Sequence, residues 1–339
     1  MLHLIASLHV PGNHEVDDFV DLARTAERGL LDSVFLDDFL ALPGPDSVVA
    51  GGLEPLTLLA AVATATEHIG LITTASTTFS EPFPLARSLA SLDHISHGRA
   101  GWNMGTGGGL DEAANFSMDE PVEAAVRYER AAELLDVVTQ LWDSWADDAT
   151  VRRERVREIE HIGLFFKVRG PLNVRRTPQG WPLLVHRAEP TSDDMEFAAR
   201  YAEVVFTGQR DIREAASFAY EVKSRAAAYG REPFLPLIVP GLVPTGSAEQ
   251  IADLMQEWAE AGAADGFAVH AQAAPGGLPR FVDHVVPVLQ RRGLFRTAYD
   301  GGTLRERFGL PRPEDHFPAF EAQTLPRPAL AWPALAAAV

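Results

Sequence analysis

The sequence contains no cysteine, which excludes disulfide bonds, thiolate metal ligands and a cysteine nucleophile. It also lacks an uninterrupted run of about 18 apolar residues, the length that a membrane-spanning helix needs. No basic segment followed by an apolar one opens the chain, as a secretory signal would require. These absences predict a protein with no membrane partner, and they fit a cytoplasmic location.

Basic residues are scarce. The chain has 29 Lys and Arg against 47 Asp and Glu, a formal net charge of −18. Proteins bind nucleic acids mainly by neutralising phosphates with Lys and Arg, so a nucleic-acid partner is not expected. The motifs GxGxxG, GxxxxGK[ST] and GxSxG are also missing, which leaves no support for a dinucleotide fingerprint, a P-loop or a nucleophile elbow.

What the chain does have is a regular alternation of short apolar runs with longer amphipathic ones, which is typical of parallel strands joined by helices. Its 339 residues suit one (β/α)8 TIM barrel, which takes roughly 250 residues plus insertions. We therefore predict an α/β barrel over residues 1–310, with an insertion at about 145–180 between strands four and five. A Pro- and Ala-rich tail follows at 311–339. The predicted strands are Leu2–Val10, Val34–Leu36, Ile69–Thr73, Arg99–Asn103, Pro182–His186, Glu203–Phe206, Phe234–Pro240 and Gly266–His270.

Active sites of such barrels lie at the carboxyl ends of the strands. Three histidines occupy predicted strand ends, and neutral imidazole can act as acid or base near pH 7. We take His186, His270 and His9 as catalytic candidates. Together with Asp37 and Asp38 they are also possible metal ligands, but no close His spacing supports this and we expect no metal.

Several segments resemble the luciferase-like flavin monooxygenase superfamily, in the branch that holds nitrilotriacetate, dibenzothiophene-sulfone and long-chain-alkane monooxygenases. The resemblance covers nearly the whole chain to about residue 310, and the segments have the same order and spacing. One deletion, between Val243 and Gly246, removes an insertion that this branch normally carries. The segments that carry the resemblance are residues 34–38, 69–78, 85–103, 115–116, 127–128, 141–145, 161–172, 197–200, 265–267 and 286–296.

The resemblance implies a (β/α)8 barrel enzyme that oxidises a small organic substrate with O2 and reduced FMN. A separate NAD(P)H:flavin reductase would supply the reduced FMN, and the chain would form a homodimer or homotetramer. Residues expected to face the isoalloxazine ring are Asp38, Thr74 and Asn103. Those expected to reach the phosphate are Tyr128, Thr191 and Ser192.

The expected phosphate site departs from the family pattern. Relatives read Gln-Ala-Gly-x-Ser-x-x-Gly there, whereas this chain reads Arg187-Ala-Glu-Pro-Thr-Ser-Asp-Asp194. Glu189 and Asp194 thus replace glycines, and each carboxylate at ~4 Å from a phosphate would cost about 1 kcal/mol even in high dielectric. Arg187 can offset part of this through a bidentate contact.

Two histidines common in this family are also missing. Gly108 and Ala124 occupy their positions, and His186 and His270 are candidates to replace them. Three hypotheses therefore stay open: an FMN-dependent two-component monooxygenase; a barrel that has lost FMN and acts as a cofactor-independent isomerase, lyase or cyclase; and a non-catalytic flavin- or ligand-binding protein.

Overall fold

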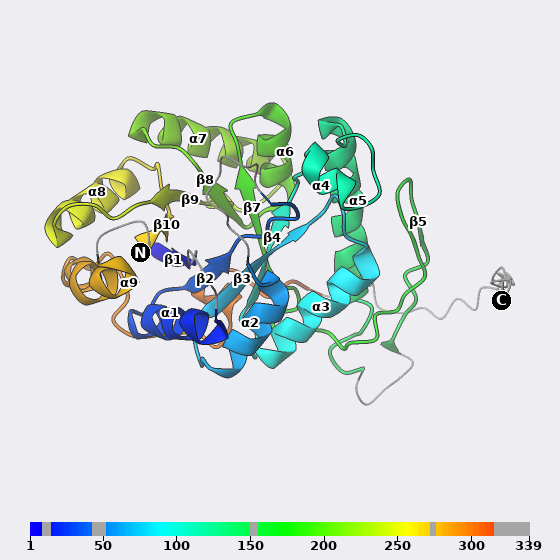
Figure 1. Cartoon of the computed structure of the whole chain (residues 1–339), viewed down its shortest axis with the longest axis horizontal. Coiled ribbons are helices and arrows are strands. Elements are labelled where there is room, and N and C mark those ends of the chain that lie inside the picture. Colours follow the sequence, from blue (N-terminus) through cyan, green and yellow to red (C-terminus); the bar gives the residue numbers. More distant parts are fainter. Residues whose placement is uncertain (9–14, 43–51, 150–154, 272–275, 315–339) are drawn as a thin grey trace, which may run out of the picture.

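The computed structural model describes residues 1–8, 15–42, 52–149, 155–271 and 276–314. Eight parallel strands close into a barrel in the order β1-β10-β9-β8-β7-β4-β3-β2, with helices around the outside (Figure 1). This confirms the predicted (β/α)8 barrel. Its strands are β1 (His3–Ser7), β2 (Ser33–Leu36), β3 (Gly70–Ser76), β4 (Ala100–Gly105), β7 (Leu183–Ala188), β8 (Val204–Thr207), β9 (Leu237–Leu242) and β10 (Gly266–Val269).

The helices begin with ordinary start signals. Prolines stand in the first turn of α2 and α3, and capping side chains precede α6, α7 and α8. No helix within the described ranges is long and apolar enough to cross a membrane. The helices are α1 (Val16–Arg28), α2 (Pro55–Thr64), α3 (Pro82–Ile95), α4 (Leu110–Ala114), α5 (Ala124–Trp142), α6 (Ser192–Tyr201), α7 (Ile212–Ala228), α8 (Ala248–Glu260), α9 (Gly277–Arg280), the π-helix η3 (Phe281–Val285), α10 (Val286–Arg291) and α11 (Leu304–Arg307).

The barrel interior is a packed apolar core. Side chains such as Ile5, Phe35 and Ile72 fill it, and the short helix α11 and the residues after it add Leu304, Phe308 and Leu310 to the same cluster. The segment around α11 therefore closes one end of the barrel. This end is the amino-terminal one, because the ring of Phe308 stacks on that of His3, at the start of β1, with 4.5 Å between centroids.

The insertion lies where it was predicted, between the fourth barrel strand, β4, and the fifth, β7. It contains an antiparallel hairpin of β5 (His161–Ile162) and β6 (Lys167–Val168), which stands out from the barrel in Figure 1. Glu133 of α5 holds this hairpin, because its carboxylate accepts hydrogen bonds from the backbone N–H groups of Leu164, Phe165 and Phe166.

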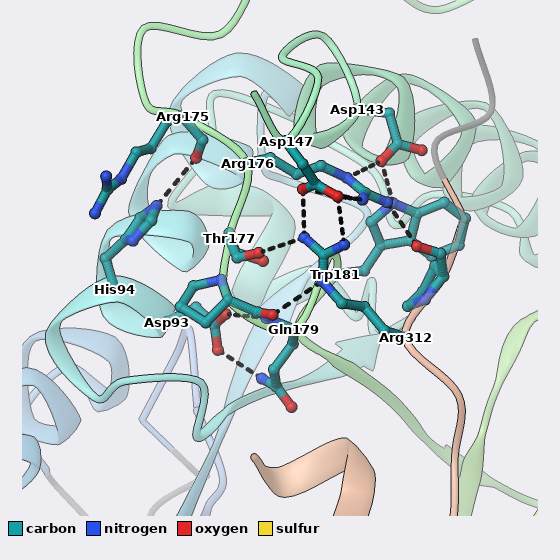
Figure 2. A network of polar contacts seen from close by, with 12 residues as sticks. Asp93, His94, Asp143, Asp147, Arg175, Arg176, Thr177, Gln179, Trp181 and Arg312 are labelled. Atoms are coloured by element: carbon teal, nitrogen blue, oxygen red, sulfur yellow. Dashed lines mark hydrogen bonds and ion pairs between the residues drawn. The ribbon is translucent and has the colours of Figure 1, made fainter. Parts of the chain in front are cut away.

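The first residues of the predicted tail are tied to the insertion by a polar network (Figure 2). Arg312 makes a bidentate ion pair with Asp147, at 2.7 and 2.6 Å. The buried Arg176 donates to Asp143 at 3.0 Å and to the carbonyl of Pro313 at 2.7 Å. The predicted tail thus begins with an anchored stretch at 311–314, and its remainder lies outside the described residues.

We expect Arg312→Ala to lower the free energy of unfolding by about 1 kcal/mol at most, because exposed ion pairs are screened by water. The Arg312 side chain is 41% exposed, and Asp147 keeps Arg176 as a second partner. Thermal unfolding of this variant beside Arg175→Ala, an exposed neighbour, measures the effect. A loss of unfolding free energy above about 2 kcal/mol would show that water does not screen the ion pair of Arg312 with Asp147.

Candidate functional site

A cavity of about 310 Å³ opens at the carboxyl ends of β2, β3, β4 and β7. It brings together five of the predicted cofactor residues: Asp38, Thr74, Asn103, Tyr128 and Arg187. Thr191 and Ser192 are not part of its lining and lie exposed at the start of α6. The full lining is Asp37, Asp38, Leu40, Thr74, Ser76, Asn103, Met104, Gly105, Thr106, Gly107, Glu112, Arg127, Tyr128, Arg187, Glu189 and Asp194. We call this space the first cavity.

Neighbouring strands hold a chain of hydrogen bonds in the first cavity. Thr74 of β3 and Asn103 of β4 are register partners. The Asn103 amide donates to the Thr74 hydroxyl at 3.0 Å, and this hydroxyl donates to Asp37 at 3.1 Å. The amide oxygen of Asn103 is buried and has no hydrogen-bond partner among the described residues. Asn103, a residue of the cavity lining, therefore carries a buried acceptor that no described residue satisfies.

An ion pair crosses the mouth of the barrel. Arg187, from the end of β7, lies 3.0 Å from Asp37, which follows β2. The Arg187 guanidinium also lies over the Phe35 ring, 5.7 Å from its centroid. Arg187 was expected near a phosphate. Its pairing with Asp37, which depends on closure of the barrel, was not predicted.

The structure gives Asp194 a different position from the one expected. Its side chain turns inward: one oxygen accepts from the Tyr128 hydroxyl at 2.7 Å and lies 2.9 Å from His186 Nε2. The other accepts from the Glu189 backbone N–H at 2.9 Å. Burial alone would raise the pKa of the Asp194 carboxyl, but the hydrogen bond and charge of His186, with the other donors, lower this pKa below its usual value.

His186 is buried between two acceptors. Its Nδ1 lies 2.9 Å from the carbonyl oxygen of Met104, and its Nε2 faces the ionised Asp194. Both ring nitrogens are therefore within hydrogen-bond distance of a protein oxygen. The Asp194 carboxylate in turn contacts His186, the Tyr128 hydroxyl and the Glu189 backbone N–H. The sequence alone did not reveal these partners of Asp194.

The other acidic groups and hydroxyls of the site also have defined surroundings. Burial, followed by the charge of Glu54, raises the pKa of the Asp38 carboxyl. Burial and the hydrogen bond to Asp194 raise the pKa of the Tyr128 hydroxyl. The Thr191 hydroxyl accepts from the Asp194 backbone N–H at 3.4 Å and so caps α6.

Gly108 lies against the side chain of Arg127. A side chain at position 108 would require the flexible Arg127 side chain to move. Arg127 lines the first cavity, donates to the Val122 carbonyl at 2.7 Å, and has a buried Nε without a partner among the described residues. Arg127 is thus a site residue that sequence reasoning missed, although it stands beside Tyr128. Ala124, at the start of α5, is exposed.

A larger space of about 540 Å³, the second cavity, opens at the ends of β8, β9 and β10. It shares Arg187 and Glu189 with the first cavity, so the two adjoin. His270 lines the second cavity, whereas His9 lies outside the described residues. No group of three or more potential metal ligands clusters within the part of the chain that the structure describes.

Comparison with known proteins identifies the family. The sequence profile described as luciferase-like monooxygenase matches residues 2–243. N-acetyl-S-(2-succino)cysteine monooxygenase of Bacillus subtilis (strain 168) is 36% identical over 422 aligned positions, covering 93% of this chain and 96% of the relative. Nitrilotriacetate monooxygenase component A of Aminobacter aminovorans is 37% identical, covering 89% and 91%. EDTA monooxygenase from Chelativorans sp. BNC1 has a similar structure, with a TM-score of 0.85 at 29% identity, covering 92% of this chain and 99% of its own.

These alignments also agree with a deletion. The 422 aligned positions exceed the 339 residues of this chain, so the Bacillus relative has residues without a counterpart here. The profile match ends at residue 243, where the sequence analysis placed the missing insertion. The barrel, the polar first cavity and these relatives together show that the chain belongs to the luciferase-like monooxygenase family and is an enzyme of the flavin-dependent monooxygenase type.

Proposed function

We propose that the chain is the oxygenase component of a two-component system that uses reduced FMN and O2 to oxidise a small organic substrate. The observation that carries this proposal is the first cavity, with its unused Asn103 acceptor. When bound, the reduced flavin supplies the reaction with O2, and the protein positions substrate and cofactor and excludes water. The reductase is a separate NAD(P)H:flavin reductase. A multi-component system is supported by the Aminobacter relative, whose name marks it as one component of nitrilotriacetate monooxygenase.

The residues at the ring end of the first cavity suit an isoalloxazine. The Asn103 oxygen can accept from a ring N–H, and binding would remove the cost of leaving this buried acceptor unpaired. Thr74 is held in place from both sides by Asn103 and Asp37. Asp38, whose carboxyl has a raised pKa, lines the same wall.

The other end of the first cavity suits a phosphate better than the sequence suggested. Arg187 and Arg127 line it, and α6 begins beside it with Thr191 and Ser192 in its first positions. Asp194 is engaged by hydrogen bonds and Asp37 by its ion pair with Arg187, but Asp38, Glu112 and Glu189 also line the cavity. The phosphate of FMN would therefore bind beside Arg127, Arg187 and the start of α6, where these donors act on it against the repulsion of the remaining carboxylates.

The alternative functions gain less support. A cofactor-independent isomerase, lyase or cyclase would need a free imidazole, and both nitrogens of His186 are engaged. We therefore assign His186 a positioning role and keep His270, in the second cavity, as the catalytic candidate. A non-catalytic binding protein would leave the enzymatic character of the relatives unexplained. We place the enzyme in the cytoplasm, where NAD(P)H is available, as a homodimer or homotetramer.

We expect Asn103→Ala to weaken binding of reduced FMN about tenfold, the effect of one lost hydrogen bond in a site without water. Anaerobic titration of the wild type and the variant measures it, and Asn173→Ala, an exposed asparagine in the insertion, is the matched control. If the wild type binds neither oxidised nor reduced FMN below about millimolar concentration, the proposed function fails.

A further inference from the structure

We propose that the second cavity binds the substrate, and that the substrate is a small organic anion: a carboxylate joined to an apolar or aromatic body. This inference rests on the proposed function and names its substrate class. The lining combines an apolar wall with a cationic end. It consists of Phe35, Arg187, Glu189, Phe206, Thr207, Gly208, Gln209, Arg210, Gly241, Leu242, Val243, Leu254, Trp258, Ala268 and His270.

The apolar wall comes from several elements. Phe35 of β2 and Phe206 of β8 pack against each other, with ring centroids 4.8 Å apart. Leu254 and Trp258 of α8 line another side of the cavity. Leu254 is 39% exposed. An apolar or aromatic body placed here would remove this surface from water, which is favourable.

The cationic end carries the specificity. Arg210, exposed just beyond β8, forms no hydrogen bond or ion pair with any residue in the described ranges, so its guanidinium is available to a ligand. An unpaired guanidinium beside an apolar wall attracts an anion, and its planar fork matches a carboxylate. Gln209 and Thr207 line the cavity next to it and add further polar groups.

The border between the two cavities directs the orientation of the substrate. Arg187 is held there by Asp37, and Glu189 lies there without an ion pair to a described residue. The Glu189 charge repels a carboxylate at the border, whereas Arg210 attracts one farther out. The carboxylate therefore binds at Arg210, and the apolar body extends past Phe35 toward the first cavity, where the cofactor is proposed to lie.

The test compares two probes of the same shape, 4-phenylbutanoate and 4-phenylbutan-1-ol, by calorimetric titration of flavin-free protein. We expect the carboxylate to bind at least about tenfold more tightly than the alcohol, the gain of a charge-assisted hydrogen bond. Arg210→Gln should reduce this preference to within about twofold, and Arg213→Gln, an exposed arginine on α7, should leave it unchanged.

Equal or tighter binding of the alcohol, no binding of either probe, or an unchanged preference in Arg210→Gln would overturn the inference. Titration of the same proteins with reduced FMN distinguishes failure of the proposed substrate class from failure of the proposed function. Loss of the preference with normal FMN binding contradicts the substrate class alone. A carboxylate preference in protein that binds no FMN contradicts the proposed function and leaves the anion site standing.

Discussion

Replacing Asp194 by alanine is expected to lower the free energy of unfolding by about 3–5 kcal/mol, the usual effect of removing one partner from a buried polar pair with a charged member. The variant leaves the His186 ring, 1% exposed, without its carboxylate partner. It also removes the acceptor for the Tyr128 hydroxyl and for the Glu189 backbone N–H. Urea unfolding followed by circular dichroism measures the loss.

Two further variants isolate the ion pair. Tyr128→Phe removes one hydrogen bond to Asp194 and should cost only about 1 kcal/mol. The double variant His186→Leu/Asp194→Leu should be less destabilised than Asp194→Ala alone, since neither polar side chain remains buried without its partner. A loss below about 1 kcal/mol for Asp194→Ala would contradict a stabilising contact between Asp194 and His186.

The same pair predicts an acid-sensitive component of stability. The pKa of the Asp194 carboxyl is lowered in the folded state, so the unfolded chain takes up a proton first as the pH falls. This contribution is therefore complete above the ordinary aspartate pKa and is lost as the pH falls through the lowered value. Asp194→Asn should flatten this part of the stability profile, measured by unfolding between neutral and acidic pH.

The second large effect concerns the segment around α11. A chain that ends at Gly302 should fail to unfold cooperatively, whereas a chain that ends at Glu314 is the reference. The shorter chain loses Leu304, Phe308 and Leu310 from the barrel core. It also loses the ion pair of the buried Arg305 with Glu203. At about 3–5 kcal/mol for each of the larger contacts, the combined loss is comparable to the whole stability of a typical folded protein, about 5–15 kcal/mol.

A point variant keeps this prediction testable if the short chain is insoluble. Phe308→Ala should cost about 3–5 kcal/mol, because Phe308 is buried in the core and stacks on His3. Thermal unfolding of this variant measures the loss. Equal melting temperatures for the two truncated chains would refute the assignment of α11 to the core.

The barrel strands were predictable because buried parallel strands read as continuous apolar runs. The run 34–36 matches β2, and 266–270 matches β10, to within one residue. The helices α4 and α11 have only five and four residues. They are too short to show the repeating apolar pattern by which a helix is predicted from sequence. Residues 281–291 form a helical run that begins with the π-helical turn η3 and continues as α10, whose second residue, Pro287, has no backbone N–H.

The first cavity was predictable in part. Five of the seven expected cofactor residues line it because strand order alone brings their elements to the same end of the barrel. The partners of Asp194 and Arg187 were not predictable. The contact of Asp194 with His186 depends on how the short connection between β7 and α6 folds back. The contact of Arg187 with Asp37 depends on how far the arginine side chain reaches across the closed barrel.

The central claim is that this family member still binds FMN by its phosphate, although carboxylates replace two glycines. Anaerobic titration with reduced FMN and with reduced riboflavin, which lacks the phosphate, tests it most directly. If Arg187, Arg127 and the start of α6 outweigh Glu189, reduced FMN binds at least about tenfold more tightly than reduced riboflavin. Equal affinities, or tighter binding of riboflavin, would show that the carboxylates prevail and would contradict the claim.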